Sequence, residues 1–200
     1  MTEYKPLQRD YLVVVDVEAT CWKDNKNPPG EQSEIIEIGV CLLNLETLER
    51  GDRRSLLLKP TRSKVSPFCT ELTSITPEMV EDGMSFAEAC AILESDFGTK
   101  NRLWGSWGGY DQKMFAAQCP SFGVPYPFAE QHVNLKTLFA EKLSLKRAVG
   151  MASALQMVGF PLDGKHHRGD DDAWNIARLT GYVLTKHPDA LAAFYEPVEG

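Results

Sequence analysis

Two acidic residues, Asp16 and Glu18, end a run of apolar, β-branched residues in the segment YLVVVDVE. Side chains two positions apart on a strand share one face, so both carboxylates should emerge side by side at the carboxyl end of a buried strand. Two carboxylates at this spacing repel each other unless a cation holds them. The pair could form part of a metal site, but a strand that simply ends in solvent could carry the same residues, so this motif alone is a weak signal.

Asp172 is a third acid, and it heads an apolar stripe in the segment HHRGDDDAWNIARLTGYVL. The stripe continues at helical spacing through Ile176, Leu179 and Val183. Asp172 should therefore point towards the core. Acids in the first turn of a helix interact favourably with its dipole, which explains Asp170 and Asp171 but not an acid on the core-facing line.

A fourth acid, Asp111, lies at the start of a predicted helix in GSWGGYDQKMF, with Met114 and Phe115 facing the core. As an N-cap it would need no chemical function. The alternative is a metal ligand delivered from a separate element. Only the combination with the other acids favours the second interpretation.

One histidine, His167, lies five residues before Asp172. That offset within one helix would place the two side chains on different faces, so His167 can share a site with Asp172 only from the preceding loop. Gly169 makes such a turn plausible. The remaining histidines are expected to be exposed: His132, His166 and His187.

The elements that must position these residues indicate an α/β fold. Strands are predicted at residues 11–16, 35–44, 54–60 and 103–107, and the first three should be antiparallel. A Pro-rich loop is predicted at residues 23–33 and a polar link at residues 45–52. Thr76-Pro77 resembles a helix start, and further helices are predicted at residues 86–97, 111–118, 134–142, 147–158 and 170–184. Helices should cover a central sheet.

The composition fits one soluble domain. The 200 residues are 43% hydrophobic and 24% charged, and no apolar run is long enough to span a membrane. Five scattered cysteines without zinc-ligand spacing favour free thiols in a reducing, cytoplasmic compartment. A net charge of −7 argues against binding a long duplex by positive charge alone, unless metal ions offset several of the acids.

With these residues in place, the chain resembles the DEDDh 3′-to-5′ exonucleases of the RNase H-like superfold. The resemblance is to the ERI-type subgroup, which includes the histone-mRNA 3′-end exonuclease. It is carried by DVEATC, NPPGEQSEIIEIGVCLLN, SPFCTELTSIT, WGGYDQKMF and HHRGDDDAWNIARL, which occur in the expected order. It implies a mixed central sheet flanked by helices and a single exonuclease domain over residues 1–200, with a core at about 9–186.

The resemblance also assigns the chemistry. Two Mg²⁺ ions, replaceable by Mn²⁺, would be held by the family's four acids, here Asp16, Glu18, Asp111 and Asp172. His167 would be the general base. The expected reaction removes nucleoside 5′-monophosphates from the 3′ end of single-stranded RNA or DNA.

Contacts to the terminal nucleotide are implied by the same resemblance at Ala19, Thr20, Phe68, Leu72 and Thr73. Base stacking is implied at Tyr110, where the family usually has Trp. Core packing is the alternative for Phe68 and Leu72. Four cations near the motifs could meet phosphates or be solvated surface charges: Lys64, Lys113, Lys165 and Arg168.

Two other functions remain open. The first is a binding module that grips 3′ ends without cleaving them, and its weakness is that such a protein has no need of mutually repelling acids. The second is a proofreading-type DNA exonuclease. The loop NPPGEQSE and the segment SPFCTELTSIT favour RNA over DNA by resemblance alone.

Overall fold

A five-stranded mixed sheet forms the centre of the computed structural model, which describes residues 6–195. The strand order is β3-β2-β1-β4-β5, and β1 is antiparallel to β2, β2 to β3, while β4 runs parallel to β1 and β5 parallel to β4. The strands are β1 (Gln8–Ala19), β2 (Ile35–Asn44), β3 (Arg50–Leu57), β4 (Arg102–Ser106) and β5 (His132–Asn134). The predicted α/β fold with three antiparallel opening strands is confirmed.

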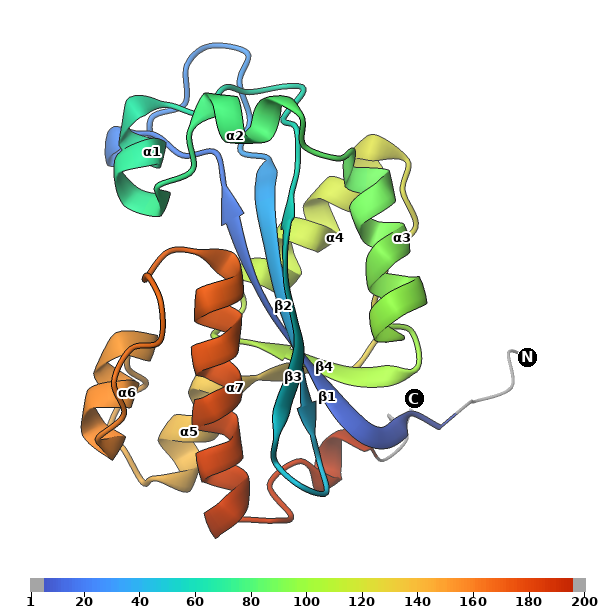
Figure 1. Ribbon diagram of the computed structural model, residues 1–200, viewed down its shortest axis with the longest axis vertical. Coiled ribbons are helices and arrows are strands. Elements are labelled where there is room, and N and C mark those ends of the chain that lie inside the picture. The colour runs from blue at the N-terminus through green and yellow to red at the C-terminus, as the bar shows by residue number, and fades with distance from the viewer. Residues whose placement is uncertain (1–5, 196–200) are drawn as a thin grey trace.

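Helices cover both faces of the sheet (Figure 1). One layer contains α5 (Leu135–Lys142), α6 (Met151–Val158) and α7 (Gly169–Lys186). The opposite layer contains α3 (Phe86–Phe97) and α4 (Tyr110–Phe122), and the short helices α1 (Pro67–Thr73) and α2 (Pro77–Glu81) lie beyond the carboxyl end of β1. Two 3₁₀ turns occur at Lys23–Asn25 and Ala192–Tyr195. None of the helices within residues 6–195 is long and apolar enough to cross a membrane.

Strand β1 divides its side chains between two cores. Leu12 and Val14 pack with residues of α5, α6 and α7, whereas Val13, Val15 and Val17 pack with residues of α3 and α4. Leu12 to Val15 are all fully buried, so the prediction of a strand buried on both faces is confirmed. Each such side chain contributes about 1.5–3 kcal/mol through burial. The even-numbered positions of β1 therefore face α7.

Local capping signals determine where α2 and α3 begin. The Thr76 side chain accepts a hydrogen bond from the Met79 N–H at the start of α2, with Pro77 in the first turn. Ser85 and Glu88 form a capping box at the start of α3, which ends at Gly98 in a left-handed conformation (φ 62°). The predicted bounds of α3 and β2 are confirmed to the residue.

Other element bounds differ from the prediction. Strand β3 begins at Arg50, four residues early, because it is an edge strand whose exposed polar residues show no apolar alternation. Helix α6 begins at Met151 rather than at the predicted Arg147, and its N-cap is Gly150. Helix α4 continues to Phe122, past residue 118. Strand β5 was not predicted, since three residues carry no periodic signal.

Candidate metal centre

Strand β1 places Asp16 and Glu18 on the face that packs against α7. They continue the even-numbered series that begins with Leu12 and Val14, and they lie near the carboxyl end of the strand. A register shift between Glu18 and Ala19 interrupts the pairing with β2 at this point. The sequence prediction that the two carboxylates share a face is confirmed.

Helix α7 brings Asp172 to the same place because two glycines allow it to touch the sheet backbone. Gly39 of β2 pairs with Asp16 of β1, and a Cβ built on Gly39 would lie 1.8 Å from the carbonyl carbon of Gly169. Only glycine permits so close an approach. Asp172, in the first turn of α7, is 4% exposed, and the stripe that follows it is buried. Its predicted inward orientation is confirmed.

Asp111 comes from the start of α4, on the other side of the sheet. The N-cap interpretation is wrong, because Gly109 holds the cap position and Asp111 lies inside the first turn. Its Oδ1 instead accepts a hydrogen bond from the Val17 N–H at 2.9 Å. That bond fixes α4 against β1 between Asp16 and Glu18. Asp111 is therefore delivered by a third element, as the metal-ligand interpretation requires.

The four acids and His167 line one pocket of about 310 Å³. Carboxylate oxygens of Asp16, Glu18 and Asp172 lie within 4.8 Å of one another. Among residues 6–195, no lysine or arginine forms an ion pair with any of the four acids, whereas the buried carboxylate of Glu37 is paired with the guanidinium of Arg168. Oxygen donors without a protein counter-charge suit a hard divalent cation.

The pKa values of the four acids are raised, which shows that ionising these carboxyl groups is unfavourable in the metal-free protein. Burial, followed by the charges of Asp172 and Glu37, raises the pKa of Glu18 from its ordinary 4.5 to about 8. Desolvation and the charges of its neighbours raise the pKa of Asp16 well above its ordinary value. Burial also raises the pKa of Asp111 and of Asp172. A bound cation would favour the ionised form of all four, so the residues fit a metal.

His167 lies on the loop before α7, as the sequence prediction requires. Its backbone is left-handed (φ 64°), and its N–H donates to Asp172 Oδ2 at 3.0 Å. The positive φ falls on His167 itself rather than on Gly169, whose role is the close approach to β2. Its Nδ1 lies 3.9 Å from Glu18 Oε1. Burial, followed by the charge of His166, lowers the pKa of His167 below its ordinary value.

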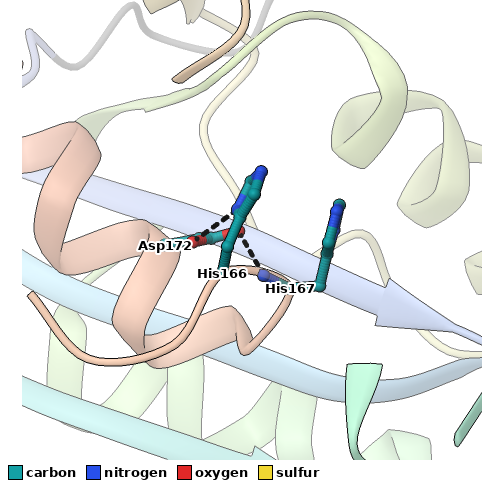
Figure 2. Close-up of side chains that lie close together, drawn as sticks. All are labelled: His166, His167 and Asp172. Carbon is teal, nitrogen blue, oxygen red and sulfur yellow. Dashed lines mark hydrogen bonds and ion pairs between the residues drawn. The ribbon is translucent and has the colours of Figure 1, made fainter. Parts of the chain in front are cut away.

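His166 was expected to be no more than an exposed loop residue, but its partly exposed side chain belongs to the site. Its Nδ1 lies 2.9 Å from Asp172 Oδ2, and its ring stacks on that of His167 with centroids 4.0 Å apart (Figure 2). The adjacent pair of histidines was the available signal. Sequence spacing does not give the direction of a loop side chain, so this signal alone does not place the His166 ring in the site.

A buried ion pair fixes the loop that carries both histidines. Glu37 is fully buried on β2, where it accepts hydrogen bonds from Arg168 Nη2 at 2.9 Å and from the Gly169 N–H at 2.8 Å. Ser55 Oγ donates to it from β3 at 2.5 Å. Arg168 is thus engaged within the protein rather than presented to a phosphate. Glu37 was missed, although an acid inside the apolar run IIEIG was a usable signal.

Three of the expected nucleotide contacts are buried. Thr20 Oγ1 lies 2.8 Å from Ser63 Oγ and accepts from the Glu34 N–H at 2.9 Å. Thr73 Oγ1 donates to the Cys69 carbonyl at 2.9 Å. Ala19 is also buried. The two hydroxyls therefore hold α1 and the end of β1 in place, and a nucleotide contact there would involve other atoms.

The other three expected contacts present large apolar surfaces to solvent. Phe68 and Leu72 lie one helical turn apart on α1, 37% and 38% exposed. Helix α1 packs on the segment after Glu18, where Ser66 Oγ donates to the Cys21 carbonyl at 2.6 Å. Tyr110, 55% exposed, lines the acid pocket itself. Core packing does not account for any of the three.

The sheet, the helix layers and the acid pocket are those of the RNase H-like exonuclease fold. The sequence pattern of the exonuclease family (RNase_T) matches residues 13–180, and the chain belongs to this family, among its DEDDh members of the ERI type. DEDDh exonucleases depend on metal ions.

Particular relatives support this placement. Human 3′-5′ exoribonuclease 1 is 32% identical in an alignment of 187 residues, which covers 88% of this chain and 52% of the relative. The chain therefore spans about half the length of that protein. The nuclease domain of 3′hExo bound to rAMP superposes with a TM-score of 0.79 at 32% identity, over 88% of this chain and 92% of that one. A 3′-exonuclease that recognises the 3′ end of a histone mRNA stem-loop gives a TM-score of 0.78 at 31% identity. The superposition covers 88% of this chain and 82% of that one.

Proposed function

We propose that this protein is a metal-dependent 3′-to-5′ exonuclease that hydrolyses single-stranded RNA from its 3′ end and releases nucleoside 5′-monophosphates. The observation that carries the proposal is the convergence of four carboxylates and one imidazole on a single pocket. The residues come from β1, α4 and α7, which are remote in the sequence. We further propose a single catalytic domain with its core at about residues 9–186.

Asp16, Glu18, Asp111 and Asp172 are the proposed ligands of two Mg²⁺ ions, which Mn²⁺ could replace. Bound in pairs, such ions activate water as a nucleophile and stabilise both the attacking and the departing oxygen of a phosphodiester. The protein contributes the fixed positions of the carboxylates. The Val17 N–H holds Asp111, and the His167 N–H together with His166 Nδ1 holds Asp172.

His167 is the proposed general base. A lowered pKa keeps its imidazole neutral at pH 7, so that a ring nitrogen can accept the proton of the attacking water. Its ring extends from a loop whose backbone is tied to Asp172 and, through Arg168, to Glu37. These ties hold the loop backbone beside the acids, so that the ring stays within reach of the attacking water.

The substrate end would lie between the acid pocket and α1. Tyr110 lines the pocket and offers a ring for base stacking, worth about 1–3 kcal/mol per base. Phe68 and Leu72 supply further exposed apolar surface on α1. The relatives bound to rAMP and specific for a histone mRNA 3′ end support an RNA substrate and a nucleoside monophosphate product.

A non-catalytic 3′-end binding module remains the alternative. Such a module would gain nothing from four buried acids that have no ion pair with lysine or arginine within residues 6–195, and whose charges raise the pKa of Asp16 and of Glu18. Replacing them with neutral residues would stabilise it. Their joint presence therefore favours catalysis.

The test is incubation with 5′-end-labelled single-stranded RNA and DNA in Mg²⁺ or in EDTA. We expect a ladder of shortened RNA that disappears in EDTA, in Asp16→Ala and in His167→Ala, with nucleoside 5′-monophosphates as products. Asp189→Ala and His187→Ala are matched controls, because both residues lie outside the pocket. An undiminished ladder from Asp16→Ala would refute the proposed site. A comparable DNA ladder would correct the substrate class alone.

We also propose a reducing, cytoplasmic location. All five cysteines are free thiols, and four of them are buried. Oxidising compartments favour paired cysteines.

A further inference from the structure

His166 lines the pocket, but the proposed hydrolysis uses it only to hold Asp172. It stands beside the proposed base, its Nδ1 is 2.9 Å from Asp172 Oδ2, and its ring lies nearly parallel to that of His167, with 18° between the planes. Figure 2 shows both imidazoles extending in the same direction from the loop, with the His166 ring beside the Asp172 carboxylate and the backbone N–H of His167 bonded to it. Two imidazoles and a carboxylate thus share one corner of the pocket.

The spacing of these three side chains approaches that of a metal site. Each offers a ligand atom, and these atoms all lie within 4.8 Å of one another. Tetrahedral zinc, with bonds of about 2.0–2.1 Å, needs roughly 3.3 Å between ligands. The imidazoles can close that difference by rotation, because the His166 and His167 side chains are 39% and 41% exposed. The same exposure leaves room for a water as the remaining ligand.

The backbone also favours this arrangement. His167 adopts a left-handed conformation that is unusual for a side-chain-bearing residue, and its N–H is bonded to the Asp172 carboxylate. In this conformation the His167 ring lies alongside that of His166. The strained backbone of His167 therefore accompanies an arrangement in which two imidazoles lie together beside Asp172.

We propose that His166, His167 and Asp172 form a second metal site, which takes a transition metal of the zinc type rather than Mg²⁺. Imidazole nitrogen is a good ligand for Zn²⁺ and a poor one for Mg²⁺, which prefers oxygen. This site differs in donor set from the four carboxylates but shares Asp172 with them. Zinc and a full set of magnesium ions therefore exclude each other.

Zinc at this site inhibits the exonuclease. It occupies the imidazole of His167 and withdraws Asp172 from magnesium. This consequence rests on the proposed function, whereas zinc binding by His166, His167 and Asp172 does not. Binding and activity are accordingly measured separately.

Binding is measured by calorimetric titration with Zn²⁺ and by the visible absorption of Co²⁺, both on the full chain in millimolar Mg²⁺. The variant is His166→Asn, because an asparagine amide can still donate to Asp172 while removing the ring nitrogen. The matched control is His187→Asn, outside the pocket. We expect His166→Asn to weaken Zn²⁺ binding by at least about tenfold and to abolish the tetrahedral Co²⁺ absorption, with no change in His187→Asn.

Inhibition is measured as the Zn²⁺ concentration that halves each variant's own Mg²⁺-dependent rate on labelled RNA. We expect that concentration to rise with His166→Asn by the same factor as the dissociation constant. Unchanged zinc affinity in His166→Asn would overturn the site, since zinc would then sit on the carboxylates. Weaker binding with unchanged inhibition would overturn its inhibitory role. Absence of any nuclease activity would refute the proposed function while the Co²⁺ spectrum still decided the site.

Discussion

Replacing Glu18 with glutamine should stabilise the metal-free protein, although it removes a proposed metal ligand. The pKa of Glu18 is raised from 4.5 to about 8, first by burial and then by the charges of Asp172 and Glu37. A raised carboxyl pKa means that the folded state holds a proton that the unfolded state has lost. Without metal, stability is therefore greatest below about pH 4.5 and falls as the pH rises towards 8.

The size of the effect follows from the same pKa values. At 1.36 kcal/mol per pKa unit, ionising Glu18 in the folded state costs roughly 3–5 kcal/mol by pH 8–9. Glutamine has nearly the same shape and no charge, so Glu18→Gln avoids this cost. For a chain of this length, 3 kcal/mol corresponds to a rise in Tm of about 6–12 °C.

The assay is thermal unfolding from pH 5 to pH 9, in EDTA and in Mg²⁺. In EDTA we expect wild type to lose Tm as the pH rises and Glu18→Gln to lose much less. Mg²⁺ should raise the Tm of wild type at pH 8 and raise the Tm of Glu18→Gln less, because a metal ion stabilises only the state that binds it. Glu71→Gln, on the exposed side of α1, is the control. Equal Tm values for wild type and Glu18→Gln at pH 9 in EDTA would refute the reasoning.

Two further predictions concern the surroundings of the acids. Arg168→Ala should lower the free energy of unfolding by about 3 kcal/mol, because it leaves the buried Glu37 carboxylate without its counter-charge; urea unfolding measures this, and a loss below about 1 kcal/mol would contradict it. Tyr110→Ala should raise KM for RNA by about 5- to 150-fold through lost stacking, while Tyr110→Phe keeps it low; initial rates decide, and equal KM values for the two variants would exclude a stacking role.

The elements that the sequence predicted well carry their own boundary signals. Helix α3 has its capping box at Ser85 and its left-handed Gly98, and β2 is a continuous apolar run. Strand β3 and β5 lack such signals because their pairing comes from partners elsewhere in the chain. The exposed polar residues of β3 have no strand pattern of their own, and β3 is defined as a strand by its pairing with β2.

The candidate site divides in the same way. Asp172 was predicted from helical periodicity, and Asp16 with Glu18 from strand alternation, since both are local patterns. Asp111 was open to an N-cap interpretation because its actual partner, the Val17 N–H, lies 94 residues away. The ion pair of Glu37 with Arg168 spans 131 residues and leaves no local pattern either. Long-range hydrogen bonds determine the roles of these residues, and such bonds cannot be predicted from the spacing of residues in the sequence.

The contrast between Glu18 and Glu37 gives the strongest structural argument for a cation. The two residues are directly opposite each other on β1 and β2, both buried, in a position where like charges destabilise a sheet. The fold compensates Glu37 fully, with Arg168, the Gly169 N–H and the Ser55 hydroxyl. Within the described residues 6–195, Glu18 has no comparable hydrogen bond, and the His167 ring lies 3.9 Å from it. The chain thus supplies a counter-charge for one carboxylate of this pair and not for the other. The negative charge of Glu18 is therefore best balanced by a bound cation.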